Sequence, residues 1–354
     1  MRKLLVAVML IFSGATLAQE APGKVLEAAV NQVIRPGMSA FAEKAGVLEG
    51  SVAALCSDPS AEGLETAHDA FADAAIAYGH VEFIRIGPLM EDNRAERLLF
   101  FPDRKGIGLR QVQAILANED TSAADVASLR GKSVAVQGFG ALEFVLHGTG
   151  FDALTGAEGQ FRCQYGAAIA ANISDIADEL ASAWQQENGI AAHLMQPAPE
   201  YDDYRTPTEA LEEIVGLVSH GLEATRDTRI NPFIAKADAA PKPKLALFWR
   251  SGLTMAMIRA NLEGMRRFID QSGVARNVAE KDKGLDNSIV FEFSNANRAL
   301  DLVTSPVDQA VEDPKQVQAL NYLVLVTGSL QAQVGEQLSA ALGLSVGFSS
   351  LDGD

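Results

Sequence analysis

The residues best able to bind or react with a ligand gather in two segments of the sequence, positions 82–110 and positions 138–148. The first segment mixes charged side chains with glycine and proline, which predicts a largely loop-like region between two helices. Loops with charges of both signs can hold a small ligand or simply remain solvated, and both interpretations stay open. The candidate side chains of this segment include Glu82, Arg85, Asp92, Asn93, Arg97, Asp103 and Arg110.

The second segment places two glycines ahead of an acidic residue, Glu143. Residues 132–143 look like a strand followed by a glycine-rich turn that holds a dinucleotide. We reject that interpretation because Glu143 stands where the third glycine should be and no βαβ pattern follows. Taken instead as the start of a helix, Gly138 and Gly140 place the carboxylate of Glu143 in the first turns, where the helix dipole stabilises a negative charge.

Common hydrolase motifs are missing from the sequence. A zinc peptidase of the His-Glu-x-x-His type needs two imidazoles one helical turn apart, and the five histidines offer no such pair. A nucleophile elbow, Gly-x-Ser-x-Gly, is absent too. Glu143 and His147 stand four residues apart, which allows a partial metal site or, more plainly, a surface pair or a core histidine. We therefore assign no catalytic residue.

Helical periodicity runs through most of the chain and predicts an all-α fold. Between positions 159 and 187, apolar residues recur at steps of three or four and form one stripe, with the acidic residues mostly away from it. Strand-like alternation is scarce, since 134–136 and 288–291 are short enough to be extended connections or helical turns. Similar helical patterns occupy positions 61–84, 106–118, 208–227, 250–271 and 314–342.

The first residues have the composition of an export signal. Arg2 and Lys3 supply a positive start, an apolar run follows, and Thr16-Leu17-Ala18 matches a small-residue cleavage site, so residues 1–18 are expected to be removed. The apolar run is shorter than the roughly 20 residues that a membrane-spanning helix needs. We therefore expect a mature periplasmic chain without a transmembrane segment.

Export to an oxidising compartment bears on the two cysteines, Cys56 and Cys163. An even count in such a compartment favours a disulfide, with two buried free thiols as the alternative. A bond between residues so far apart in sequence would stabilise the fold by roughly 4–5 kcal/mol in the chain-entropy model.

Proline-rich punctuation divides the chain into two parts. The segment 197–207 carries three prolines and no helical period, so it is expected to end one helical bundle and begin another. The predicted organisation is an export signal over 1–18, an N-terminal bundle over 19–200 and a C-terminal bundle over 201–354. The two bundles could be diverged copies of one bundle.

Several parts of the sequence together resemble the imelysin family. Residues 138–148 look like its Gly-x-His-x-x-Glu signature, followed by an aliphatic run and a glycine. Residues 81–88, 92–94, 101–106 and 109–111 resemble the block that precedes the signature, while Phe248-Trp249-Arg250-Ser251-Gly252 and residues 347–354 resemble landmarks of its second half. The resemblance covers essentially the whole mature chain. It departs from the family at one decisive position, where Gly140 occupies the place of the signature His.

The resemblance implies an all-helical, two-bundle protein of the bacterial periplasm or cell surface, associated with iron uptake and formerly described as a peptidase. In the family, the His and Glu of the signature are the suspected metal ligands, near the groove between the bundles. Of these two suspected ligands, only Glu143 is present in this sequence. The departure therefore weakens the prediction of metal binding, and it weakens the prediction of peptidase activity further. The cofactor stays open, with iron or another divalent metal as the candidates.

These observations predict an imelysin-like binding protein of the cell envelope, with a polar site between the two bundles for a small ligand or a metal ion. The alternatives are an imelysin-type metallopeptidase and a scaffold that binds another envelope protein. Nucleic acid is not an expected partner, because 29 basic against 46 acidic residues give a formal charge of −17. Glu143 and His147 are the candidate metal ligands. The expected ligand-binding residues are Glu82, Arg85, Asn93, Arg97, Asp103, Arg110, Glu143 and Arg250.

Overall fold

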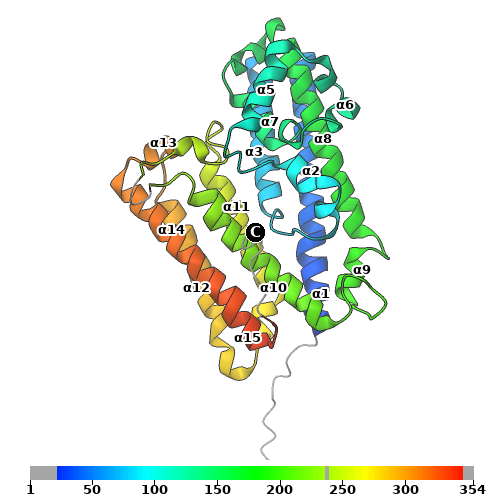
Figure 1. The fold of residues 1–354 in the computed structure, drawn as a ribbon, viewed down its shortest axis with the longest axis vertical. Coiled ribbons are helices and arrows are strands. Elements are labelled where there is room, and N and C mark those ends of the chain that lie inside the picture. The colour runs from blue at the N-terminus through cyan, green and yellow to red at the C-terminus, as the bar shows by residue number, and fades with distance from the viewer. Residues whose placement is uncertain (1–21, 236–238, 346–354) are drawn as a thin grey trace, which may run out of the picture.

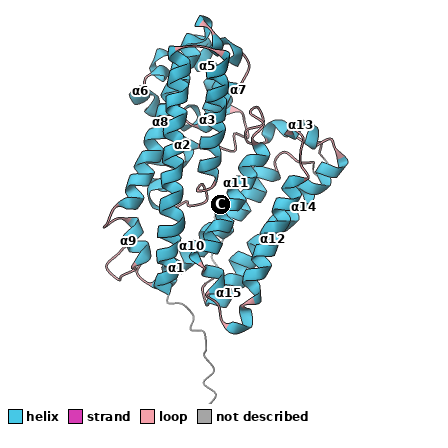
Figure 2. Cartoon of the chain, turned by 180° about the vertical axis from the view of Figure 1, so that it is seen from behind, coloured by secondary structure: helices cyan, strands magenta, loops and turns pink. Residues whose placement is uncertain are grey.

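Long helices build the whole architecture in the computed structural model, which describes residues 22–235 and 239–345. Figures 1 and 2 show two groups of long helices lying next to each other, with their axes inclined. No strand forms within the described residues, and the all-α prediction is confirmed. The expected export signal and the family landmark at 347–354 lie outside the described residues.

The first group is formed around three long helices, α2 (Arg35–Ser57), α3 (Ala61–Gly79) and α8 (Gln160–Gln185). The apolar stripe predicted for α8 is buried apart from the half-buried Phe161, and Tyr165, Ile173 and Trp184 on it are fully enclosed. Ser60 begins α3 as an N-cap whose hydroxyl accepts a hydrogen bond from the backbone of Gly63. The shorter helices are α1 (Pro22–Ala28), α4 (Arg94–Leu98), α5 (Ile107–Asn118), α6 (Val126–Arg130), α7 (Phe139–His147) and α9 (Ile190–Met195).

The second group contains α10 (Pro207–Ala224), α11 (Thr254–Ser272), α12 (Gly284–Asp301) and α14 (Pro314–Ala332), with the short α13 (Val307–Ala310) and α15 (Ser339–Leu342). Thr206 caps α10 and Asp313 caps α14, each followed by a proline at the first helical position. Both caps satisfy backbone N–H groups that a helix start otherwise leaves unpaired. Segments of π-helix continue three helices, at Ala29–Ile34, Thr225–Ile230 and Gln333–Leu338.

The two groups meet closely where the end of α3 crosses α11. A Cβ atom on Gly264 would lie 2.2 Å from the carbonyl oxygen of His80, so only glycine allows this approach. Beside it, the side chain of Asn261 donates a 2.9 Å hydrogen bond to the carbonyl oxygen of Gly79. Buried side chains from both groups form one continuous hydrophobic core. The division into an N-terminal and a C-terminal bundle near residue 200 therefore stays a prediction.

Several elements differ from the sequence pattern in extent. Helix α3 ends at Gly79 rather than near 84, because α11 lies against the chain there and Asn261 takes the Gly79 carbonyl that another turn of helix would use. Helix α11 begins at Thr254 rather than 250. The predicted loop over 82–110 is partly helical, with a 3₁₀ segment at Gly87–Asn93 followed by α4 and the start of α5. Of the two ambiguous segments, 288–291 belongs to α12 and 134–136 is a 3₁₀ turn.

A disulfide joins Cys56 at the end of α2 to Cys163 near the start of α8, with 5.5 Å between the two Cα atoms. It links two long helices that pack along much of their length. The fold therefore brings the two cysteines together from positions 107 residues apart.

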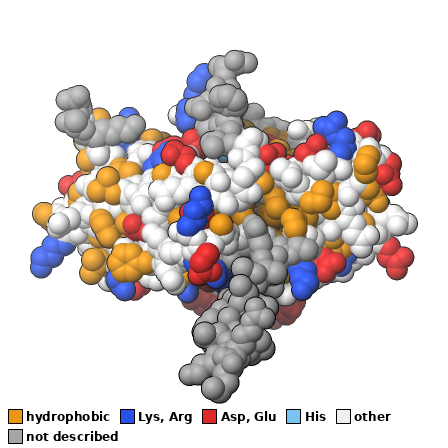
Figure 3. Space-filling view, turned by 90° about the horizontal axis from the view of Figure 1, so that it is seen from below, with side chains coloured by type: hydrophobic (Ala, Val, Ile, Leu, Met, Phe, Trp, Pro, Cys, Tyr) orange, Lys and Arg blue, Asp and Glu red, His pale blue; other side chains and the backbone are white. Residues whose placement is uncertain are grey.

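The outer surface is mixed in character. Figure 3 shows one face on which acidic and basic side chains are interspersed with hydrophobic ones. Among the helices in the described ranges, none combines the length and apolar composition needed to cross a membrane.

Candidate functional site

The polar residues that the sequence groups together lie in several separate places. Glu82 forms an ion pair with Arg229 and accepts a 3.0 Å hydrogen bond from Asn261, at the crossing of α3 and α11. The guanidinium of Arg229 also stacks over the ring of Phe101, 4.6 Å from its centroid. All three polar side chains are largely buried, so Glu82 connects the two helix groups rather than lining an open site.

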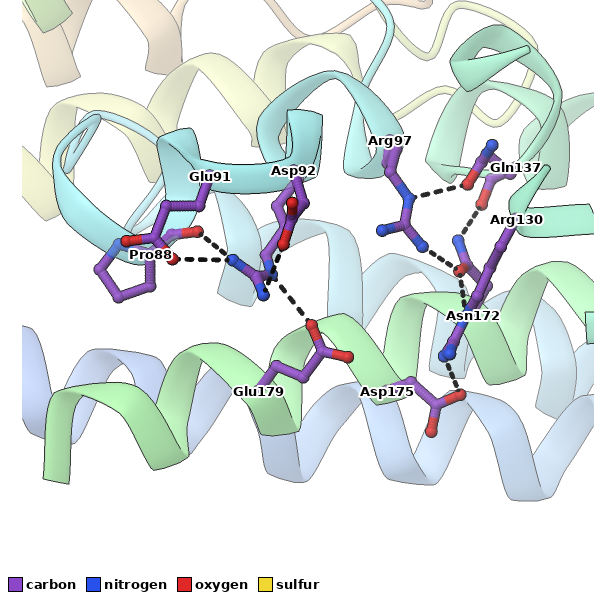
Figure 4. Close-up of polar contacts among 10 residues, drawn as sticks. Pro88, Glu91, Asp92, Arg97, Arg130, Gln137, Asn172, Asp175 and Glu179 are labelled. Carbon is purple, nitrogen blue, oxygen red and sulfur yellow. Dashed lines mark hydrogen bonds and ion pairs between the residues drawn. The ribbon is translucent and has the colours of Figure 1, made fainter. Parts of the chain in front are cut away.

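Arg97 belongs to a second network, on the surface of α8. Its guanidinium donates to Gln137 and Asn172, each at 2.9 Å, as Figure 4 shows. Burial lowers the pKa of Arg97, and the nearby charge of Arg130 lowers it further. The neighbouring Arg94 forms ion pairs with Glu91, Asp92 and Glu179 instead. This network fastens the segment 88–97 to α8, which is a structural role.

Most of the remaining members of the 82–110 block also have local partners. Arg85 pairs with Glu96 at 3.0 Å, and Arg110 donates to the carbonyl oxygen of Lys105 at 2.8 Å. Asn93, with φ of 54°, precedes the first residue of α4. Asp103 accepts hydrogen bonds from the backbone N–H groups of residues 107 and 109 and so secures the start of α5. The structure therefore does not gather the predicted residues into one site.

Glu143 is held by a segment from the other half of the sequence. One oxygen of its carboxylate accepts hydrogen bonds from the backbone N–H groups of Arg250 and Ser251, at 3.0 and 3.1 Å, and from the Ser251 hydroxyl at 3.1 Å. Glu143 is the fifth residue of α7, which begins at Phe139. Burial raises the pKa of Glu143, while the Ser251 N–H and the Arg250 charge oppose this shift.

The segment that contacts Glu143 is a tight turn with unusual backbone geometry. Phe248 has φ of 56°, a left-handed conformation that a bulky residue rarely adopts, and Gly252 has φ of 74°. Leu253 N–H closes the turn onto the Phe248 carbonyl at 3.1 Å, while the Phe248 ring packs edge-on against Phe71. Surrounding contacts thus fix a conformation that is costly by itself, a situation that is common near binding sites.

A pocket of about 330 Å³ opens between this turn and α7. Its volume lies within the range of small-molecule sites. Aromatic and aliphatic side chains make most of its wall, and Glu143 lies buried at its inner side with 4% of its surface exposed. The lining comes from Leu99, Phe100, Phe101, Pro102, Asp103, Arg104, Gly106, Gly108, Leu109, Val112, Ala135, Gly140, Glu143, Phe144, Pro232 and the run from Lys244 to Arg250.

Arg250 is one of the charged groups on the wall of this pocket. Its guanidinium lies over the rings of Trp249 and Phe144, at 4.5 and 5.4 Å from their centroids, and 3.7 Å from the second oxygen of Glu143. Lys244 lies over the same Trp249 ring at 5.6 Å. Stacking on ring faces is favourable for both cations and fixes the guanidinium plane along the wall.

Gly140 faces open space in the same pocket. A Cβ atom built on it meets no heavy atom within 4 Å, so the pocket has room where the family signature carries a His. The position of the missing imidazole is therefore at the pocket wall, one turn of α7 before Glu143.

His147, the other candidate metal ligand, is engaged elsewhere. Its ring stacks on His68 with 4.0 Å between centroids and touches Phe71, while Glu143 turns to residues 250 and 251. Burial lowers the pKa of His147 to about 4, and the neighbouring His68 adds to this shift. Within the described residues, no group of three or more His, Cys, Asp or Glu side chains is placed to hold a metal ion.

Three of the eight predicted ligand-binding residues line this pocket, namely Asp103, Glu143 and Arg250. Sequence reasoning missed Phe100, Lys244 and Trp249, which add apolar surface and charge. Trp249 could have been predicted to line the pocket, because it lies beside Arg250 in the Phe-Trp-Arg-Ser-Gly landmark. Phe100 and Lys244 follow from the fold alone, because each lies in a segment without helical or motif character.

Comparison with known proteins finds a matching family and similar solved structures. The imelysin family model matches residues 34–334. The structure of an imelysin-like protein from Psychrobacter arcticum is similar, with a TM-score of 0.77 and 17% identity over 97% of this chain and 100% of that one. The structure of a candidate iron-regulated protein A precursor from Parabacteroides distasonis is also similar, with a TM-score of 0.73 and 14% identity over 93% of this chain and 97% of that one. At these identities, the likeness concerns the fold. A comparison with curated proteins found no match.

Proposed function

The chain belongs to the imelysin family, and we propose that it is an exported binding protein of the cell envelope whose ligand site is the pocket between α7 and the 244–250 segment. The main support for this proposal is an apolar pocket of about 330 Å³ that has the buried Glu143 and the stacked Arg250 at its wall. A few polar groups converging on an apolar cavity are typical of small-molecule sites.

The location of the pocket supports this proposal. Its walls come from residues 99–112 and α7 on one side and from Pro232 and residues 244–250 on the other, so elements distant in sequence close around it. The left-handed backbone conformation of Phe248 belongs to the turn that contains Trp249 and Arg250. A ligand filling this pocket would contact both helix groups at once.

The role in iron acquisition is the second part of the proposal. One structural relative is named as an iron-regulated protein, and the sequence resembles a family associated with iron uptake. In this chain we propose that a small ligand, rather than a bare metal ion held by a His and Glu pair, occupies the site. Gly140 supplies no metal-binding group, and one oxygen of Glu143 is already engaged by three donors.

Blocking the pocket tests this function. A Gly140→Phe substitution should fill the cavity without disturbing the fold, because its Cβ meets nothing within 4 Å. A host strain that produces this variant should grow under iron limitation as poorly as a strain without the gene. Gly50→Phe is the matched control, since Gly50 is an exposed glycine of α2 that also has open space around it.

Two outcomes would contradict the proposal. Full growth of the Gly140→Phe strain, with the variant exported at the parental level, would show that the pocket is not needed. Normal growth of the strain without the gene under iron limitation would remove the iron role. Fractionation of the host cells checks the expected location in the periplasm.

A further inference from the structure

The guanidinium of Arg250 has hydrogen-bonding capacity that the fold leaves unused. Its side chain is only 19% exposed, yet the structure gives its five N–H donors no hydrogen-bond acceptor among the described residues. The nearest carboxylate oxygen, on Glu143, is 3.7 Å away, which is too long for a hydrogen bond. A planar guanidinium with free donors is suited to bind a carboxylate through two parallel hydrogen bonds.

The charges around the pocket also favour an anion. Arg104, Lys244 and Arg250 line it, against Asp103 and Glu143 as the acidic groups. Both carboxylates already accept hydrogen bonds, Asp103 from two backbone N–H groups of α5 and Glu143 from three donors of the 250–251 turn. In a chain with a formal charge of −17, this pocket has one more basic than acidic side chain in its lining.

The remaining wall favours a flat apolar body. Phe100, Phe101 and Trp249 contribute rings, and Leu245 and Leu247 contribute aliphatic surface. Phe100 and Leu245 are 36% and 38% exposed, so they leave apolar surface open to the solvent. Covering such surface with an aromatic ligand is favourable by the hydrophobic effect and by ring stacking.

We propose that the pocket binds a small organic monocarboxylate with a flat aromatic body, whose carboxylate contacts the guanidinium of Arg250 while its ring lies against Trp249 and Phe100. This inference rests on the proposed function of the pocket and names the chemical class of its ligand. Inorganic anions lack the apolar body, and bare metal cations are disfavoured by the three neighbouring basic side chains.

Calorimetric titration with three probes tests the ligand class on the unmodified protein. 2-Naphthoate has both the ring and the carboxylate, 2-naphthalenemethanol has the ring alone, and acetate has the carboxylate alone. We expect 2-naphthoate to bind at least about tenfold more tightly than the alcohol, and acetate to show no measurable binding, since each additional interaction of 1.4 kcal/mol is a factor of ten. Equal affinity of 2-naphthoate and the alcohol, or no binding of 2-naphthoate at millimolar concentration, would overturn the inference.

Two variants locate the effect. Arg250→Gln should reduce the affinity for 2-naphthoate to that of the alcohol and leave the alcohol unchanged, whereas Arg259→Gln, an arginine of α11 that pairs with Asp301, should change neither. Gly140→Phe should abolish binding of both probes. If Gly140→Phe leaves 2-naphthoate binding intact, the anion binds elsewhere and the inference fails. Failure here leaves the growth test of Gly140→Phe as an independent decision on the proposed function.

Discussion

Glu143 determines the conformation of the turn that forms the pocket wall. Replacing it by Ala would leave the backbone N–H groups of Arg250 and Ser251 and the Ser251 hydroxyl without their acceptor, and would leave Arg250 without its nearby charge. We expect Glu143→Ala to lower the free energy of unfolding by about 3–5 kcal/mol. Glu143→Gln keeps one acceptor oxygen and should cost only about 1–2 kcal/mol. Urea unfolding measures both, and equal losses for the two variants would contradict this role.

His147 should make stability depend on pH in a defined window. Its pKa is about 4 in the folded protein because of burial and the adjacent His68, against 6.5 for an ordinary histidine. The unfolded chain binds this proton more tightly than the folded one. The contribution of the neutral His147 to the free energy of unfolding is therefore complete above pH 6.5 and is lost as the pH falls toward 4. His147→Gln should therefore show a smaller fall in melting temperature between pH 7 and pH 4 than the parent. Burial lowers the pKa of His80 as well, so part of the fall should persist. Identical pH profiles for parent and variant would refute the assignment to His147.

At the scale of elements, α7 tests whether the pocket can become a metal site. An imidazole introduced by Gly140→His would stand in open space one turn before Glu143. The charge of Arg250 opposes a cation there, so the gain should be larger when it is removed. Calorimetry with Zn²⁺ should show binding about tenfold tighter for Gly140→His than for the parent, and tighter again for Gly140→His with Arg250→Gln. Gly50→His, on the surface of α2, controls for adding one histidine. No gain in either pocket variant would show that Glu143 is not available as a ligand.

At the crossing of α3 and α11, we expect the stability of the protein to be unusually sensitive to one added methyl group, at Gly264. In Gly264→Ala the new Cβ would approach the His80 carbonyl oxygen to 2.2 Å, so the helices must separate, at a cost of about 3 kcal/mol or more. Gly46→Ala lies in α2 with open space around it and should instead stabilise by about 0.5–1 kcal/mol, because Ala restricts the unfolded chain and favours helix. Unfolding experiments on the two variants should give changes of opposite sign.

Sequence patterns predicted the elements better than they predicted the site, for a physical reason. Periodicity is local, so the stripe on α8 follows from neighbouring residues along the chain. Where α3 ends depends on Asn261, 182 positions away from Gly79, and no local pattern contains that contact. For the same reason, Glu82 and Arg97 looked like ligand-binding residues, although Arg229, Gln137 and Asn172 already engage them. Gly140, Glu143 and Arg250 were recognisable because they lie in family landmarks.

At the scale of the whole molecule, export and the disulfide make one joint prediction. Protein recovered from the periplasm should begin at Gln19, and its intact mass should rise by about 2 Da on reduction as the Cys56–Cys163 bond takes up two hydrogens. Because the bond joins residues 107 positions apart, the Cys56→Ser/Cys163→Ser variant should lose roughly 4–5 kcal/mol of stability in the chain-entropy model. The parent in a reducing agent should lose a similar amount, which controls for the serine side chains. Two alkylatable thiols in native periplasmic material would rule out the bond in the cell. An unprocessed N-terminus would instead rule out cleavage after Ala18, and with it the main reason for expecting an oxidising compartment.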